Sequence, residues 1–117
     1  ADRAILFTAI RHGHCFIGYD LAADSRGFMF SGHSEHGNAV MGDVLTFSLG
    51  ATLQVRCPVP GRIRILQAGN VIREWPASEH AVLTISRPGA YRAEVQLPSG
   101  NSFRPWIYSN PIFAERS

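Results

Sequence analysis

The chain has 117 residues and 45% hydrophobic content, which is enough for one domain built around a single core. Its net charge is +2, and all 11 basic residues are arginine. These arginines are spread along the sequence and not clustered, which argues against a nucleic-acid partner. No apolar run is long enough to span a bilayer, so we expect a soluble domain without a membrane partner, whose compartment the sequence does not determine.

The first predicted element is a short helix over residues 1–13. Asp2 can cap its start and Gly13 can end it. Because the chain starts without Met and enters this helix at once, we expect a C-terminal fragment of a longer protein, with residues 1–117 forming one domain. The helix would then continue from a preceding domain. Its apolar positions recur at helical spacing: Ile5, Leu6, Ala9 and Ile10.

Short strands follow at regular intervals. Alternating apolar and polar residues predict half-buried strands over 44–49 and 53–57. Gly69 and Asn70 predict a hairpin between residues 62–66 and 71–75, and we expect residues 81–85 and 91–97 to form the next pair. Strands of this length and spacing, with one helix, predict a mainly β fold. The expected architecture is an immunoglobulin-like antiparallel β-sandwich with one short N-terminal helix.

Two cysteines occupy strand-like segments, Cys15 and Cys57. A buried free cysteine behaves as a small hydrophobe. A disulfide across the sheets is possible in an immunoglobulin-type sandwich. The two positions have no spacing signature, and therefore we favour free thiols.

The closing stretch, PWIYSNPI at residues 105–112, predicts an aromatic strand, an Asn-Pro turn and a short last strand. With AIRHG at 9–13, GFMF at 27–30, MGD at 41–43 and IRILQAGNV at 63–71, it resembles the C-terminal β-sandwich that follows the catalytic barrel in many PHP-domain proteins, the polymerase-and-histidinol-phosphatase-type metal-dependent phosphoesterases.

The resemblance implies a non-catalytic accessory domain that packs on the PHP barrel of its parent chain, regulates it, or makes homo-oligomer contacts. A barrel needs roughly 200 residues or more, so the chain has no room for one. Divalent metals are therefore implied only for the barrel, and we expect no cofactor in this segment. The runner-up function is a ligand-binding, carbohydrate-binding-like β-sandwich module that uses exposed aromatic rings.

Interface or ligand residues are expected at the entry from helix to strand and at the aromatic exit. If Ile107 faces the core, alternation places Trp106 and Tyr108 together on the outer face. Such a patch marks an interface more often than a ligand platform. Asn110 is expected to cap the turn before Pro111. The candidates are Arg11, Tyr19, Asp20, Arg104, Trp106, Tyr108 and Asn110.

One histidine-rich turn is a weak metal candidate. His33 and His36, with Glu35 between them, could offer nitrogen and oxygen donors, and His12 and His14 would have to converge on them. A polar turn flanked by glycines is usually solvated, and structural zinc normally recruits thiolates. We therefore expect no native metal site, and the sequence predicts no catalytic residue.

Overall fold

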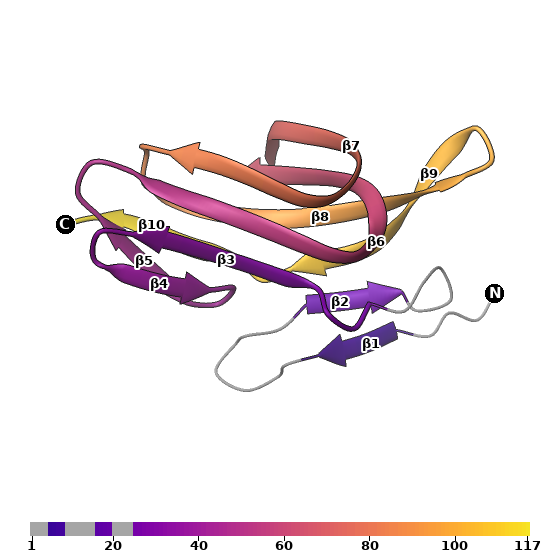
Figure 1. The fold of residues 1–117 in the computed structure, drawn as a ribbon, viewed down its shortest axis with the longest axis horizontal. Helices are drawn as coiled ribbons and strands as arrows, with labels where there is room; N and C mark the ends of the chain where they lie inside the picture. Colours follow the sequence, from indigo (N-terminus) through magenta and orange to yellow (C-terminus); the bar gives the residue numbers. More distant parts are fainter. Residues whose placement is uncertain (1–4, 9–15, 20–24) are drawn as a thin grey trace.

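The computed structural model describes residues 5–8, 16–19 and 25–117, and within them it is built of strands (Figure 1). This arrangement confirms the prediction of a mainly β fold. None of the described residues lies in a helix that could cross a membrane. The strands are β1 (Ile5–Thr8), β2 (Phe16–Tyr19), β3 (Met29–Ser34), β4 (Gly37–Val40), β5 (Val44–Phe47), β6 (Ala51–Gln67), β7 (Asn70–Ile85), β8 (Gly89–Ser99), β9 (Ser102–Ser109) and β10 (Ile112–Arg116).

The predicted N-terminal helix is wrong where the structure can test it. Residues 5–8 form β1, which pairs antiparallel with β2 in the register Ile5 to Tyr19 and Thr8 to Phe16. The segment ILFT consists mainly of residues that favour strands, and a short isolated helix is marginal in water. Pairing with β2 therefore makes this segment a strand and not a helix. The rest of the predicted helix lies outside the described residues.

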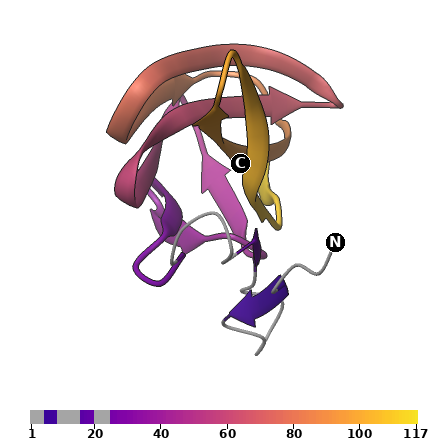
Figure 2. The same ribbon diagram turned by 90° about the vertical axis from the view of Figure 1, so that its right-hand side faces the viewer.

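Strand β6 organises the sheet. One edge of β6 pairs with β7, while the other pairs first with β3, over residues 51–56, and then with β8, over residues 62–67. Between the two halves the register with β7 shifts, and Pro58 and Pro60 supply no N–H donor there. The hairpin of β6 and β7 bends at this point and folds the sheet over the core (Figure 2).

The strands form one hydrogen-bonded sheet, and the two layers expected of a sandwich are the two halves of this curled sheet. Its main order is β1-β2-β9-β8-β6-β3-β4. Strand β10 pairs antiparallel with β8 and parallel with β5, which corrects the expectation of purely antiparallel pairing. A bond from Ser34 Oγ to the Thr46 carbonyl, 2.5 Å long, then links β3 to β5. The sheet is thereby nearly closed into a barrel.

The core lies on the concave side of the curled sheet. Alternation along β6 buries Ala51, Leu53, Val55 and Cys57 in its first half. At the bend, Gly61 leaves room for the neighbouring strand, because a Cβ there would lie 2.7 Å from Val95 Cγ1. The largest fully buried side chains are Trp106, Tyr91, Phe30, Phe47, Leu45, Leu53, Ile63, Ile65, Ile107 and Ile112.

The hairpin predicted around residues 67–70 is present. Gln67 pairs with Asn70, so Ala68 and Gly69 are the two loop residues, one position earlier than expected. Their φ angles are 52° and 81°, as a type I′ hairpin turn requires. The expected pairing of residues 81–85 with 91–97 is wrong. Strand β7 runs on past its proline and keeps β6 as its partner, with Ala81 opposite Val55.

Candidate functional site

The aromatic exit does not present the expected exposed pair. Trp106 and Ile107 are both completely buried, whereas Tyr108 is 37% exposed. Val95 pairs with Ile107 and Gln96 pairs with Pro105, so Trp106 is an extra residue in β9, a β-bulge. The bulge turns two consecutive side chains inward, and Trp106 becomes a core residue instead of a surface one.

The other predicted interface residues are spread over the molecule. Tyr108 lies on the outer face opposite Glu94, and Arg104 is exposed further along β9. Asn110 is half-buried in the turn between β9 and β10. At the entry, Tyr19 ends β2 and pairs with Ile5, while Arg11 and Asp20 lie outside the described residues.

The two histidines of the metal candidate face different partners. His33 Nδ1 hydrogen-bonds Asn38 Oδ1 across β3 and β4. His36 Nε2 lies 2.8 Å from Ser48 Oγ, in the loop after β5. Within residues 5–8, 16–19 and 25–117, no three His, Cys, Asp or Glu side chains gather as a metal ion requires. His12 and His14 lie outside these ranges.

The same turn instead closes the barrel. Buried Ser34 donates to the Thr46 carbonyl and accepts a bond from the His36 amide at 3.1 Å. Glu35 Oε1 accepts the Ser48 amide at 2.6 Å. We call these residues, Ser34, Glu35, His36, Thr46 and Ser48, the barrel seam. It joins the β3–β4 turn to the end of β5, where sheet hydrogen bonding stops.

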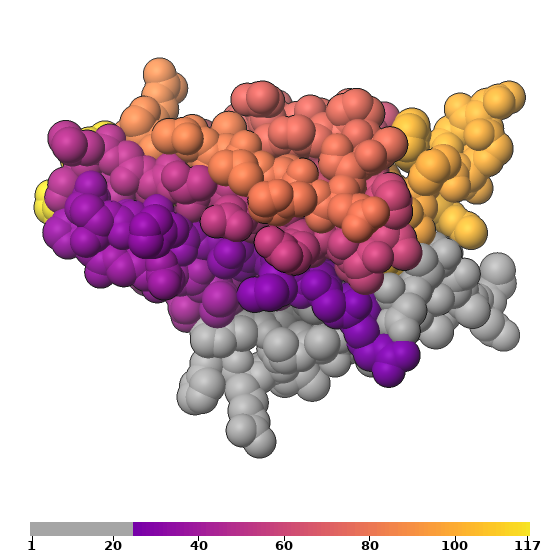
Figure 3. Space-filling model, viewed as in Figure 1, coloured from indigo at the N-terminus to yellow at the C-terminus, as the bar shows by residue number. Residues whose placement is uncertain are grey.

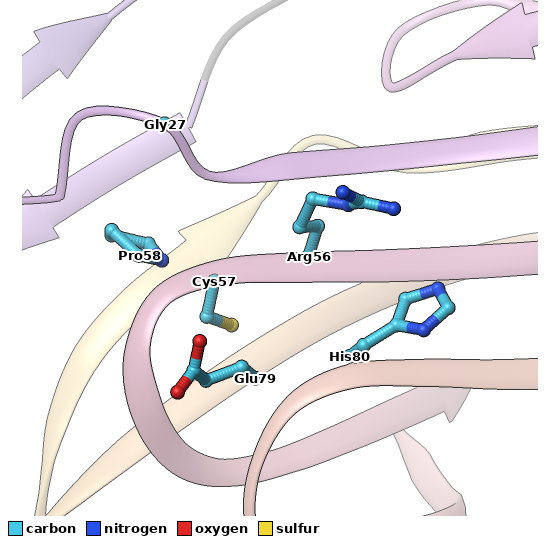
Figure 4. A pocket seen from close by; sticks show the side chains of 6 residues that line it. All are labelled: Gly27, Arg56, Cys57, Pro58, Glu79 and His80. Carbon is cyan, nitrogen blue, oxygen red and sulfur yellow. The ribbon is translucent and has the colours of Figure 1, made fainter.

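Cys57 is a buried cysteine that lines a hollow in the surface, shown in Figure 4. It is a free thiol, only 4% exposed, as expected, and Cys15 lies outside the described residues. Burial, reinforced by the nearby Glu79 carboxylate, raises the pKa of the Cys57 thiol from 9.0 to about 12. The thiolate is the reactive form, so this cysteine is unreactive at neutral pH.

This pKa makes stability depend on alkaline pH. Between pH 9 and 12 the unfolded thiol releases its proton while the folded one retains it, so the free energy of unfolding falls as pH rises. We expect Cys57 to contribute a slope of about 1.4 kcal/mol per pH unit in this window. Urea unfolding of the wild type and of Cys57→Ala at several pH values measures it. Equal slopes in the two proteins would contradict the assignment.

One outer face of the barrel carries an exposed apolar row. Phe113 on β10 pairs with Ala90 on β8 and with Val44 on β5, so the three side chains lie side by side across three strands. Phe113 is 46% exposed and Val44 54%. The next positions outward on β5 and β10 are polar, Thr46 and Glu115. We call Ala90, Phe113 and Val44 the apolar row.

The outer face of β6 and β8 is different, because two of its arginines, Arg62 and Arg64, contact side chains of the domain. Arg64 bridges two carboxylates, with Nε 3.3 Å from Glu74 Oε1 and Nη1 3.1 Å from Glu94 Oε1. Arg62 donates to Gln96 Oε1 and stacks on the Phe103 ring, with the guanidinium 3.8 Å from the ring centroid. These two guanidinium groups are therefore occupied within the domain, whereas Arg92, on the same face of β8, is exposed.

Comparisons with protein families, with curated proteins and with solved structures found no match. The sequence could have indicated one member of the apolar row. Alternation in the last strand places Phe113 on the outer face, between the core residues Ile112 and Ala114. The sequence does not show that Ala90 and Val44 lie beside it.

Proposed function

We propose that this chain is a non-catalytic accessory domain of a PHP-type metal-dependent phosphoesterase homologue, and that it packs on the catalytic barrel through the apolar row. The observation that carries the proposal is the exposed row on β8, β10 and β5. The resemblance of residues 105–112 supports the family, and this segment leads directly into β10, which carries Phe113.

The composition of this surface favours packing over ligand capture. Interfaces between domains combine an apolar centre with a polar rim, and here Phe113 and Val44 are bordered by Glu115 and Thr46. Covering side chains of this size contributes up to about 1.5–3 kcal/mol each when they start fully exposed. Because both start about half-exposed, the gain is smaller, and we expect the packing to need the covalent link to the barrel.

The environments of three buried nucleophiles, Cys57, Ser34 and Ser109, support the non-catalytic part of the proposal. The Cys57 thiol is held protonated by burial. Buried Ser34 and Ser109 use their hydroxyl oxygens for main-chain bonds, including one from the Ala93 amide to Ser109 Oγ at 2.8 Å. Neither of these two buried serines is bonded to a histidine side chain, as an activated nucleophile would be. Ser48 does contact a histidine, with Oγ 2.8 Å from His36 Nε2, but its hydroxyl also lies 2.8 Å from Ser117 Oγ.

The proposal is tested by phosphoesterase assays with added Mn²⁺ on this chain alone and on the same chain joined to the PHP barrel. We expect hydrolysis only by the joined protein. Phe113→Ser in the joined protein should weaken the packing and lower its melting temperature. Val82→Ser, at an apolar residue of similar exposure on β7, should leave the packing unchanged. Metal-dependent hydrolysis by the chain alone, lost on replacing His33 and His36, would overturn the proposal.

The carbohydrate-binding alternative receives less support. A sugar platform needs exposed rings beside a groove, but Trp106 is buried and the Phe103 ring is already stacked under Arg62. Phe113 belongs to the apolar row on other strands. The exposed aromatic rings of the described residues are thus dispersed.

A further inference from the structure

A surface hollow lies on a different face from the apolar row, between β6, β7 and the residues that precede β3. Figure 3 shows β3, β6 and β7 as neighbouring violet, magenta and orange bands of one face. The hollow has a volume of about 460 Å³, within the range of small-ligand sites. Its lining residues, shown in Figure 4, are Gly27, Arg56, Cys57, Pro58, Glu79 and His80.

Two nitrogen-bearing side chains meet in this hollow. Arg56 of β6 pairs directly with His80 of β7, so both project from the same face of the sheet. Figure 4 shows the guanidinium and the imidazole on the same side of the hollow. A guanidinium offers a planar fork of N–H donors, and an imidazole adds another donor.

Arg56 differs from the other arginines of its strand. Arg62 and Arg64 have side-chain partners on β7, β8 or β9. Among the described residues, the Arg56 guanidinium and the His80 ring have neither a hydrogen-bond nor an ion-pair partner. Their donors are thus available to a ligand.

The acidic residue of the hollow is directed elsewhere. Figure 4 shows the Glu79 carboxylate beside Cys57 Sγ, away from the Arg56 guanidinium. Glu79 therefore lowers the positive potential of the hollow without occupying the donors of Arg56. This placement predicts that removing its charge strengthens the binding of a negative group.

The polar lining continues from this hollow along β3 and β6. A smaller hollow of about 170 Å³ shares Arg56 and adds Ser31 and Gln54 beside Met29. Met29, Arg56 and His80 are aligned across three strands, and Ser31 and Gln54 form the next row. Among the described residues, no Phe, Tyr or Trp ring lines either hollow, so we expect hydrogen bonding and charge to select the ligand.

We propose that Arg56 and His80 form a binding site for an oxyanion, the carboxylate or phosphate group of a small ligand, with Gln54 and Ser31 contacting the rest of that ligand. Arginine binds both groups through two parallel hydrogen bonds, and charge-assisted bonds of this kind are the strong ones. The site is independent of the packing function, because it shares no residue with the apolar row.

The test is a titration of the ¹⁵N-labelled chain with inorganic phosphate and, separately, with acetate at constant ionic strength. We expect saturable amide shift changes around Arg56 and His80 with at least one anion, and the tighter one identifies the group that the site prefers. Arg56→Gln should weaken binding about 10-fold or more, and Arg56→Lys less. Arg92→Gln, an exposed arginine on β8, should leave it unchanged.

Glu79→Gln provides a test in the opposite direction. Removing this carboxylate should tighten binding of the preferred anion about 2- to 5-fold, because a like charge leaves the hollow. His80→Gln should weaken it by a similar factor. Absence of saturation with both anions would overturn the proposal, as would equal weakening by Arg56→Gln and Arg92→Gln.

Discussion

Replacing Trp106 by alanine is expected to lower the free energy of unfolding by about 3–5 kcal/mol. Trp106 is the largest of the fully buried side chains, and the bulge in β9 points it into the core with Ile107. Its removal forfeits the burial of the indole and leaves a cavity that the neighbouring strands can fill only in part. A single domain is stable by only about 5–15 kcal/mol, so this is a large fraction of the total.

Tyr108 supplies the matched control for this prediction. It is the next aromatic residue on β9, but its side chain faces outward opposite Glu94. We expect Tyr108→Ala to cost about 1 kcal/mol or less. Urea unfolding followed by circular dichroism compares the two variants without depending on tryptophan emission. Similar losses for both would show that the bulge is absent and that β9 alternates regularly.

The inner face of the sheet was predictable because its pattern is local. Alternation at residues 44–47, 53–57 and 91–97 marks residues that are buried in the structure, among them Leu45, Leu53 and Val95. The strand predicted over 44–49 ends at Phe47, and Leu49 beyond it is 85% exposed. The two-residue hairpin between β6 and β7 was predictable for the same reason, since a loop with positive φ angles favours glycine. These features depend on neighbours in the sequence.

Features that depend on a distant strand were not predictable. The bulge at Trp106 is defined by the register between β8 and β9, in which Val95 pairs with Ile107 and Gln96 pairs with Pro105. The segment ILFT at residues 5–8 suits a helix or a strand, and only its pairing with β2 decides. The parallel pair of β5 and β10 joins segments from opposite halves of the chain, and no turn residue marks it.

The candidate sites were missed for the same reason. The apolar row requires Val44, Ala90 and Phe113 to be brought together by two strand pairings. The Arg56–His80 pair requires the register of β6 with β7. The histidine turn was noticed for its metal-ligand residue types, but the partner of His36 is Ser48, a residue that the spacing of the histidines does not indicate.

Replacing Ser34 by alanine is expected to open the barrel seam and to lower the free energy of unfolding by about 1–3 kcal/mol. Ser34 Oγ is buried, donates to the Thr46 carbonyl at 2.5 Å and accepts the His36 amide at 3.1 Å. Alanine would leave both main-chain groups without this partner where β3 and β5 share no sheet hydrogen bonds. The effect should concentrate at the seam.

Hydrogen exchange distinguishes a local opening from general destabilisation. In Ser34→Ala, the amides of β4 and of the turn at 35–36 should lose protection first, while β6 and β8 retain theirs until global unfolding. Ser31→Ala is the control, since Ser31 lies on the same strand but faces outward. The same exchange pattern in both variants would contradict this prediction, because it would show that the seam hydrogen bonds do not stabilise β4. Selective loss at β4 would show that these side-chain bonds hold the last gap in the barrel closed.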